Sequence, residues 1–232
     1  MRLKNIVLLF AITMYFSCEK EDKFIIEGVI RDAASDRPLE GISLKVDAIR
    51  SSSGWGILTD GRRETVASAS TDANGYYRIK IKVFKLAESL EFYLNPDISQ
   101  NHVSTMKDIM LSAINIRETN TMNFKLSPLS ILKINFKNTA PVADDDFFSF
   151  GWYDNGTGWS KGVIGRLNCG TVQVNEAANW IGKDVCGSYN VNTVAEDYTH
   201  VYWTVKKNGL TTTYNDSIFV KVDMINEFTI NY

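Results

Sequence analysis

Few residues in this sequence have the types and spacing that catalysis requires. The chain has two histidines, His102 and His200, and neither lies in a G-x-S-x-G, H-E-x-x-H or cysteine–histidine context. Both are interpreted as surface residues. Two carboxylates for glycoside hydrolysis would have to meet in space, and no acidic pair stands out along the chain. The sequence therefore predicts a protein that is not an enzyme and holds no cofactor, with a surface hydrolase of glycan or peptide as the alternative.

Aromatic residues beside polar ones point to binding instead. Trp152, Tyr153 and Trp159 flank residues 154–158, whose Asp and Asn could hydrogen-bond a sugar while its ring stacks on an aromatic face. The alternative is that alternate aromatic side chains of this strand fill the core. Trp55 lies between two glycines in a polar loop, so it either contacts a ligand or folds back over its own domain. These four residues are the candidate ligand contacts.

Two further motifs carry weaker predictions. The acidic run 144–146 could offer oxygens to calcium, but it lacks the glycine and distal glutamate of an EF-hand loop, so a solvated turn is favoured and no metal site is predicted. Asp216, Ser217 and Ile218 resemble a short bacterial O-glycosylation acceptor, which makes Ser217 a candidate modification site.

The first residues have the character of an export signal. Arg2 and Lys4 precede an apolar run over Ile6–Phe16, which is too short for a membrane-spanning helix because such a helix needs about 20 apolar residues. Ser17 and Cys18 resemble the end of a bacterial lipoprotein signal, although Tyr15 stands where leucine is usual. The resemblance implies cleavage after residue 17 and acylation of Cys18, including palmitate. Two or more acyl chains hold a soluble domain stably on a membrane. An ordinary cleaved signal with an incidental cysteine is the alternative.

The acidic and basic residues after Cys18 bear on which face the protein occupies. Residues 18–22, Cys-Glu-Lys-Glu-Asp, resemble the surface-export tag of some Gram-negative lipoproteins. That resemblance implies a lipid anchor in the outer membrane with the protein facing the cell exterior. The periplasmic face is the alternative, with the charges acting only as a flexible tether.

Composition and cysteines limit the remaining possibilities. The net charge is −2 and no basic patch stands out along the chain, so no nucleic-acid partner is expected. Cys169 and Cys186 remain after Cys18 and are separated by roughly 16 residues, so an oxidising compartment favours a disulfide between them over two free thiols. No C-x-x-C motif is present that would indicate a metal site.

Short alternating segments and frequent turn residues predict an all-β chain of two consecutive β-sandwich domains after a lipoprotein signal peptide. The expected divisions are a signal peptide, a lipidated tether, a first sandwich and a second sandwich, at residues 1–17, 18–23, 24–127 and 130–232. Strands are expected in the first sandwich at 24–30, 42–49, 64–71, 76–83, 89–94 and 121–126, with a hairpin turn at 72–75 and a short helix or irregular excursion at 106–116. Strands are expected in the second at 131–137, 147–153, 198–206, 210–214, 217–222 and 227–232, with 159–167 returning as the partner of 147–153. Residues 169–192 are expected to be irregular with one helical turn at 177–182, and Asn208-Gly209 predicts a type I′ hairpin.

Three motifs in the first domain resemble the carboxypeptidase regulatory-like family. They are Gly28-Val-Ile-Arg-Asp32, Pro38-Leu-Glu-Gly-Ile-Ser-Leu-Lys-Val46 and Ser70-Thr-Asp-Ala-Asn-Gly-Tyr-Tyr-Arg-Ile79. The resemblance implies a transthyretin-like β-sandwich that serves as a non-catalytic accessory module. Gly41 and Gly75 suit tight turns, and five residues are expected to face the core: Ile42, Leu44, Val46, Tyr77 and Ile79.

The sequence thus favours a membrane-anchored, surface-exposed lipoprotein that acts as a binding or structural module. Its expected partners are the membrane, through lipid on Cys18, and a glycan or protein at the cell surface. A structural subunit that donates or accepts a strand is a third interpretation, for which a loosely held segment 227–232 would be a sign.

Overall fold

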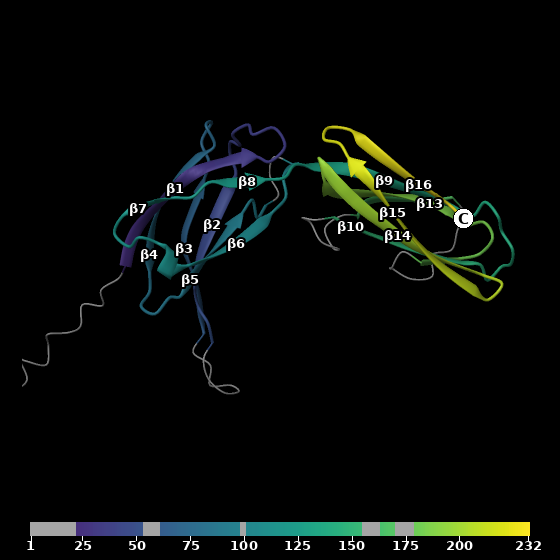
Figure 1. The fold of residues 1–232 in the computed structure, drawn as a ribbon, viewed down its shortest axis with the longest axis horizontal. Helices are drawn as coiled ribbons and strands as arrows, with labels where there is room; N and C mark the ends of the chain where they lie inside the picture. Colours follow the sequence, from purple (N-terminus) through teal and green to yellow (C-terminus); the bar gives the residue numbers. More distant parts are fainter. Residues whose placement is uncertain (1–21, 53–60, 98–100, 155–162, 170–178) are drawn as a thin grey trace, which may run out of the picture.

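The protein is built almost wholly from β-strands, as the sequence predicts. The structure, a computed structural model, describes residues 22–52, 61–97, 101–154, 163–169 and 179–232 (Figure 1). The strands that form the first sandwich are β1 (Asp22–Asp32), β2 (Ser43–Arg50), β3 (Arg62–Ser70), β4 (Tyr76–Val83), β5 (Ser89–Leu94), β6 (Thr105–Met110), β7 (Thr119–Thr121) and β8 (Phe124–Leu126). Those of the second are β9 (Leu129–Lys137), β10 (Phe147–Tyr153), β11 (Val163–Asn168), β12 (Asn179–Ile181), β13 (Cys186–Val194), β14 (Asp197–Lys207), β15 (Leu210–Val220) and β16 (Ile225–Asn231). None of the helices in these ranges has the length and apolar character needed to cross a membrane.

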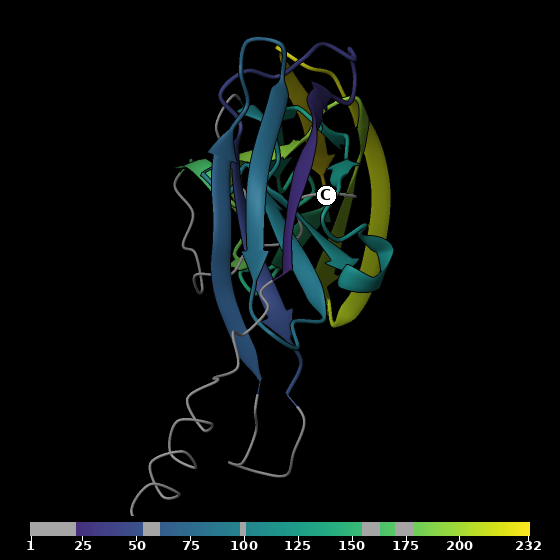
Figure 2. The same cartoon turned by 90° about the vertical axis from the view of Figure 1, so that its left-hand side faces the viewer.

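The first sandwich packs two sheets face to face. One has the order β4-β1-β7, with β8 also beside β1, and the other has the order β3-β2-β5-β6. Side chains alternate along each strand, so one face of each sheet is apolar. All five residues predicted to face this core are buried: Ile42, Leu44, Val46, Tyr77 and Ile79. Figure 2 looks along the long axis, with this sandwich in front of the second.

The turn at 72–75 forms, but the prediction of a hairpin there is wrong. Asp72 accepts hydrogen bonds from the backbone N–H groups of Asn74 and Tyr76, and Gly75 adopts a φ of 69°. However, β3 pairs with β2, and β4 pairs with β1. The turn therefore carries the chain from one sheet to the other. The same turn residues suit a hairpin and a crossing between sheets, which is why the sequence alone could not distinguish these two connections.

The segment 106–116, expected to be a short helix or an irregular excursion, contains most of the strand β6. β6 forms the edge of its sheet beside β5, and the 3-10 turn η2 (Leu111–Ala113) follows it. β7 and β8 then run parallel to β1. Between them, Met122 lies so close to Gly28 that a Cβ on that glycine would be 1.7 Å from the Met122 carbonyl oxygen. Gly28 is therefore required by the approach of the two backbones.

The second sandwich has sheets ordered β12-β10-β14-β15 and β11-β13-β9-β16. Its core is aromatic. Trp180 is fully buried and stacks on Phe150 with the ring centroids 5.5 Å apart. Phe136 packs against both rings.

Two predictions in this domain are wrong. The described part of the segment 159–167, residues 163–167, does not return beside β10, because β11 pairs with β13, while β10 lies between β12 and β14. Of the segment 169–192, expected to be irregular with a helical turn at 177–182, the described residues 179–192 contain the strand β12 and most of β13. Burial does alternate along β13, but the sequence does not show it clearly. The polar Thr193 occupies an inward position, and glycine, serine and asparagine fill many of the strand's other positions.

The end of the chain follows the prediction more closely. Asn208 and Gly209 have φ values of 51° and 75°, as a type I′ hairpin requires. The hairpin joins β14 to one continuous strand, β15, instead of the two short strands expected there. β16 pairs in parallel with β9 over seven residues, and Tyr232 stacks on Phe148 at 4.4 Å between centroids. The last strand is thus held firmly in its sheet.

Candidate binding surface on the second sandwich

Tyr153, His200, Tyr202, Asn215 and Ser217 share the outer face of the sheet β10-β14-β15, and we call this set the tyrosine platform. Tyr153 lies opposite His200, which lies opposite Ser217, and Tyr202 lies opposite Asn215. Because alternate side chains point to the same face, the register alone brings these residues together. They line a shallow depression of about 450 Å³.

The aromatic rings of the platform are arranged as an open surface. The rings of Tyr153 and His200 stack with centroids 4.8 Å apart and planes inclined by 21°. Tyr153 is 45% exposed, so much of its ring meets solvent. Tyr202 lies over Gly151, where a Cβ would be 2.2 Å from the Tyr202 hydroxyl oxygen. The lack of a side chain at Gly151 therefore creates the space that the Tyr202 ring occupies.

The platform can donate and accept hydrogen bonds at neutral pH through Asn215 and Ser217. Burial raises the pKa of Tyr202, so its hydroxyl keeps its proton, but that oxygen is itself buried over Gly151 and does not face solvent. Asn215 and Ser217 are exposed. Asp216 accepts a hydrogen bond from the Ser217 backbone N–H at 2.7 Å, which orders the strand at this edge. An exposed ring with neutral donors and acceptors beside it suits a neutral polar ligand such as a sugar.

The structure separates the residues that were predicted to share a ligand. Tyr153 faces outward, whereas Trp152 lies opposite the buried Val201 and packs against the core with its ring 6.1 Å from Phe150. Neighbours on a strand point to opposite faces, so Trp152 and Tyr153 do not meet one ligand. Trp55, Trp159 and Cys18 lie outside the described residues, and their roles stay predictions. Ser217 is exposed, and its glycosylation also stays a prediction.

Sequence reasoning missed three members of the platform. His200, Tyr202 and Asn215 were not singled out as ligand contacts. The signal was present in part, because His200 and Tyr202 alternate with the core residues Val201 and Val205. What the sequence did not reveal is that β10 and β15 flank this strand in a register that joins their outward residues.

His102 is a buried residue, and the prediction of a surface position is wrong. Its Nε2 lies 2.7 Å from a carboxylate oxygen of Asp32, and both side chains are only 10% exposed. Asp32 also accepts hydrogen bonds from the backbone N–H groups of Ala34 and Ser35 and from the Ser35 hydroxyl. Burial opposes ionisation of Asp32, but the hydrogen bonds from His102 and Ser35 outweigh it, so the pKa of Asp32 lies below its usual value.

This cluster does not have the order of a catalytic triad. In a triad the histidine lies between the carboxylate and the serine and takes the serine's proton. Here Asp32 is in the middle, and the Ser35 hydroxyl donates to Asp32 at 2.8 Å. The arrangement holds the turn after β1 in place and activates no nucleophile.

Two other predictions concern the second sandwich. Cys169 and Cys186 form a disulfide with their Cα atoms 5.4 Å apart, which confirms the predicted bridge. In the acidic run, Asp146 is buried and accepts hydrogen bonds from the backbone of Val142 and Ala143, so it caps its own turn. Across the described ranges, no group of three or more histidine, cysteine or acidic side chains is placed to hold a metal ion.

Comparisons with known proteins give only distant similarity. No protein-family model matches the chain, so the resemblance to the carboxypeptidase regulatory-like family is not confirmed. No curated protein matches it either. Among solved structures, the chain is similar to a streptococcal ancillary pilin at 14% identity and a TM-score of 0.37, covering 90% of this chain and 62% of the pilin. It is also similar to the minor pilin GBS52 of Streptococcus agalactiae at 12% identity and a TM-score of 0.35, covering 90% and 94% of the two chains. The shaft pilin SpaA of Lactobacillus rhamnosus GG shows 12% identity and a TM-score of 0.29 over 91% and 98%. TM-scores this low do not establish a shared topology or function.

Proposed function

We propose that this chain is a lipid-anchored surface protein whose second sandwich binds a neutral glycan on the tyrosine platform. The observation that carries this proposal is the open stack of Tyr153 and His200 beside Tyr202, Asn215 and Ser217 on a solvent-facing sheet. A sugar ring has apolar C–H faces and hydroxyl groups at its edge. It would stack on Tyr153 while its hydroxyls bond to the polar side chains.

The rest of the chain would present this surface. Cys18 would carry the acyl chains, residues 18–23 would form the tether, and the sandwich of residues 24–127 would act as a spacer. We place the protein in the outer membrane facing the medium, on the strength of the residues that follow Cys18. The carboxypeptidase regulatory-like assignment of the spacer belongs to this proposal. Within the described residues, the single aspartate–histidine cluster is built to stabilise a turn, so it offers no support for a hydrolase.

Glycan binding is tested by screening the mature chain on a glycan array and then measuring the best ligand by calorimetry. Tyr153→Ala should weaken binding at least about fivefold, because stacking on an aromatic ring contributes about 1–3 kcal/mol in comparable contacts. Tyr214→Ala is the matched control, since Tyr214 is also 45% exposed but lies on the opposite phase of β15, stacked on Trp203. Equal losses in the two variants, or no binder on the array, would refute the platform as a glycan site.

The anchor is tested separately. Cells expressing the wild-type chain should incorporate labelled palmitate into the protein, and cells expressing Cys18→Ala should not. Protease added to intact cells should degrade the wild-type protein if it faces the medium. Full protection from protease would place it on the periplasmic face.

A further inference from the structure

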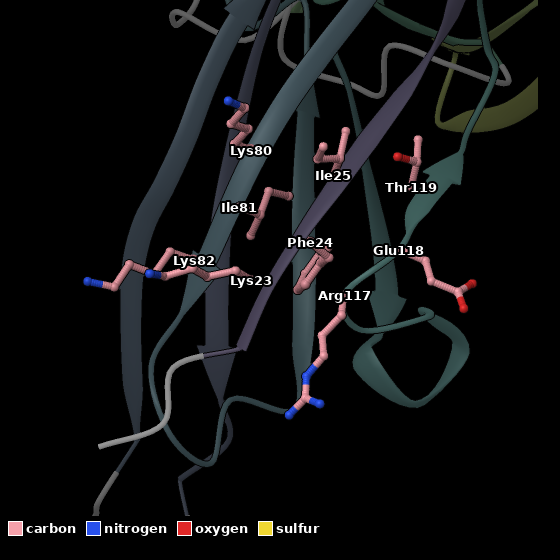
Figure 3. Close-up of a pocket in the computed structure, with 9 residues that line it drawn as sticks. All are labelled: Lys23, Phe24, Ile25, Lys80, Ile81, Lys82, Arg117, Glu118 and Thr119. Atoms are coloured by element: carbon pink, nitrogen blue, oxygen red, sulfur yellow. The ribbon is translucent and has the colours of Figure 1, made fainter. Parts of the chain in front are cut away.

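A charged surface feature lies where β1 begins, in the sheet β4-β1-β7. Lys23, Lys80, Lys82 and Arg117 surround a depression of about 340 Å³, and we call these four residues the cationic rim (Figure 3). All four side chains are exposed. Glu118 is the one acidic residue among those lining the depression. Four cationic residues and one acidic residue thus line this depression, on a chain whose net charge is −2.

The strand register forces three of these cations together. Lys23 lies directly opposite Lys82, and Lys80 lies opposite Ile25 on the same face. Phe24 and Ile81 alternate with them and point into the core. Like charges opposite each other on paired strands are unfavourable. A site that gathers cations in this way is complementary to an anion placed over the sheet.

The position of the cationic rim determines which anion would reach it. β1 begins at Asp22, four residues after Cys18 in the sequence. Four residues span at most about 14 Å when fully extended. Charges interact over a Debye length of roughly 8–10 Å at physiological salt. A lipid on Cys18 would therefore hold this end of the first sandwich within two Debye lengths of the membrane even with the tether fully extended, and closer when the tether is not extended.

We propose that the cationic rim binds the phosphate groups of the lipid leaflet in which Cys18 is anchored. This inference rests on the lipid anchor of the proposed function, because the anchor supplies the proximity. Such binding would also orient the protein on the membrane. In Figure 1, β1 starts at the end of the first sandwich away from the second, and the chain leaves through β8 at the other end. Contact between the rim and the headgroups would point the tyrosine platform away from the membrane.

The test measures membrane binding without the anchor. The mature chain carrying Cys18→Ala is sedimented with vesicles of phosphatidylcholine alone, or with phosphatidylglycerol as one lipid in three. Binding should occur only to the anionic vesicles, with an apparent dissociation constant of about 1 mM lipid, and should weaken as salt is raised. Replacing Lys23, Lys80 and Lys82 by glutamine should weaken binding about fivefold per charge, or roughly 100-fold together.

A control triple variant removes the same charge elsewhere. Lys107, Lys206 and Lys221 are exposed lysines on β6, on β14 and after β15, and replacing them by glutamine should leave vesicle binding within about twofold of the parent. Equal loss in both triple variants would show that only net charge matters and would overturn the rim as a site. Equal binding to both vesicle types would overturn it as well. So would binding to a soluble anionic polysaccharide but not to vesicles. Because acylation is assayed by palmitate labelling of the wild-type chain, the anchor and the rim can fail independently.

Discussion

Replacing Asp32 by alanine should destabilise the first sandwich by about 3 kcal/mol. The carboxylate accepts four hydrogen bonds, from the Ala34 and Ser35 backbone, from the Ser35 hydroxyl and from His102. The turn residues Ala34 and Ser35 are exposed, so water can replace most of what they lose. His102 is buried and cannot exchange its partner for bulk water. A hydrogen bond to a charged group contributes about 1.5–3 kcal/mol, and loss of the capped turn adds about 1 kcal/mol.

Urea unfolding followed by circular dichroism measures this effect. With an m value of roughly 2 kcal/mol/M, a loss of about 3 kcal/mol lowers the midpoint by about 1.5 M. The matched control is Asp36→Ala, since Asp36 lies in the same turn with its carboxylate exposed and paired with Lys125. The control should shift the midpoint much less, because exposed ion pairs contribute little.

The pH dependence of the stability difference between wild type and Asp32→Ala gives a second test, and the direction of that dependence is determined by the pKa of Asp32. The pKa of Asp32 is lowered in the folded state from its ordinary value of 3.8, so its stabilising contribution is fully present above that value. The contribution disappears as the pH falls through the lower pKa of the folded state. Wild type and Asp32→Ala should therefore differ at pH 7 and at pH 5 and converge in acid. A midpoint unchanged at pH 7, or a difference that grows toward low pH, would refute this account of the cluster.

Three other substitutions or treatments follow from the packing. Gly28→Ala should lower the free energy of unfolding by at least about 2 kcal/mol, because the new methyl group would overlap the Met122 carbonyl. Hydrogen exchange should detect lost pairing near β7 in this variant. The control Val29→Ala, on the same strand, should not show that loss. Reducing the disulfide of Cys169 and Cys186 should lower the stability of the second sandwich by about 3 kcal/mol, with the first sandwich unfolding as before in urea. Asp146→Ala should cost about 2 kcal/mol at pH 7, with the difference shrinking in acid because hydrogen bonds from the Val142 backbone and Asn138 outweigh burial and lower the pKa of Asp146. An Asp146→Ala midpoint equal to wild type at neutral pH would show that the turn does not depend on this carboxylate.

Local pattern was enough to predict most strands of this fold. β4 shows why, because its residues alternate between buried Tyr77, Ile79 and Ile81 and exposed charged positions. Asn208-Gly209 was equally informative, since few residue pairs accept positive φ at two successive positions. In both cases the information lies within a few residues of the chain.

The errors arise where the deciding partner is far away in sequence. His102 looked like an isolated polar residue, and only its approach to Asp32, 70 positions earlier, makes it a buried residue. The turn at 72–75 was predicted correctly, but the choice between hairpin and sheet crossing depends on which strands pair with β3 and β4. The tyrosine platform was only partly visible for the same reason. Tyr153 and Ser217 come from different strands and meet only through the register around β14.

The parallel pairing of β1 with β8 has a mechanical consequence. A pull between a membrane anchor at Cys18 and a ligand on the second sandwich would enter at the beginning of β1 and leave at the end of β8. In this pair Ile30, Arg31 and Asp32 lie beside Phe124, Lys125 and Leu126 and run in the same direction. Tension applied to opposite ends of parallel neighbours loads their hydrogen bonds together in shear, whereas tension on adjacent ends would open them one at a time. In a chain anchored and bound in this way, the first sandwich would carry traction along its long direction and would resist extension in flowing medium better than unpaired termini allow.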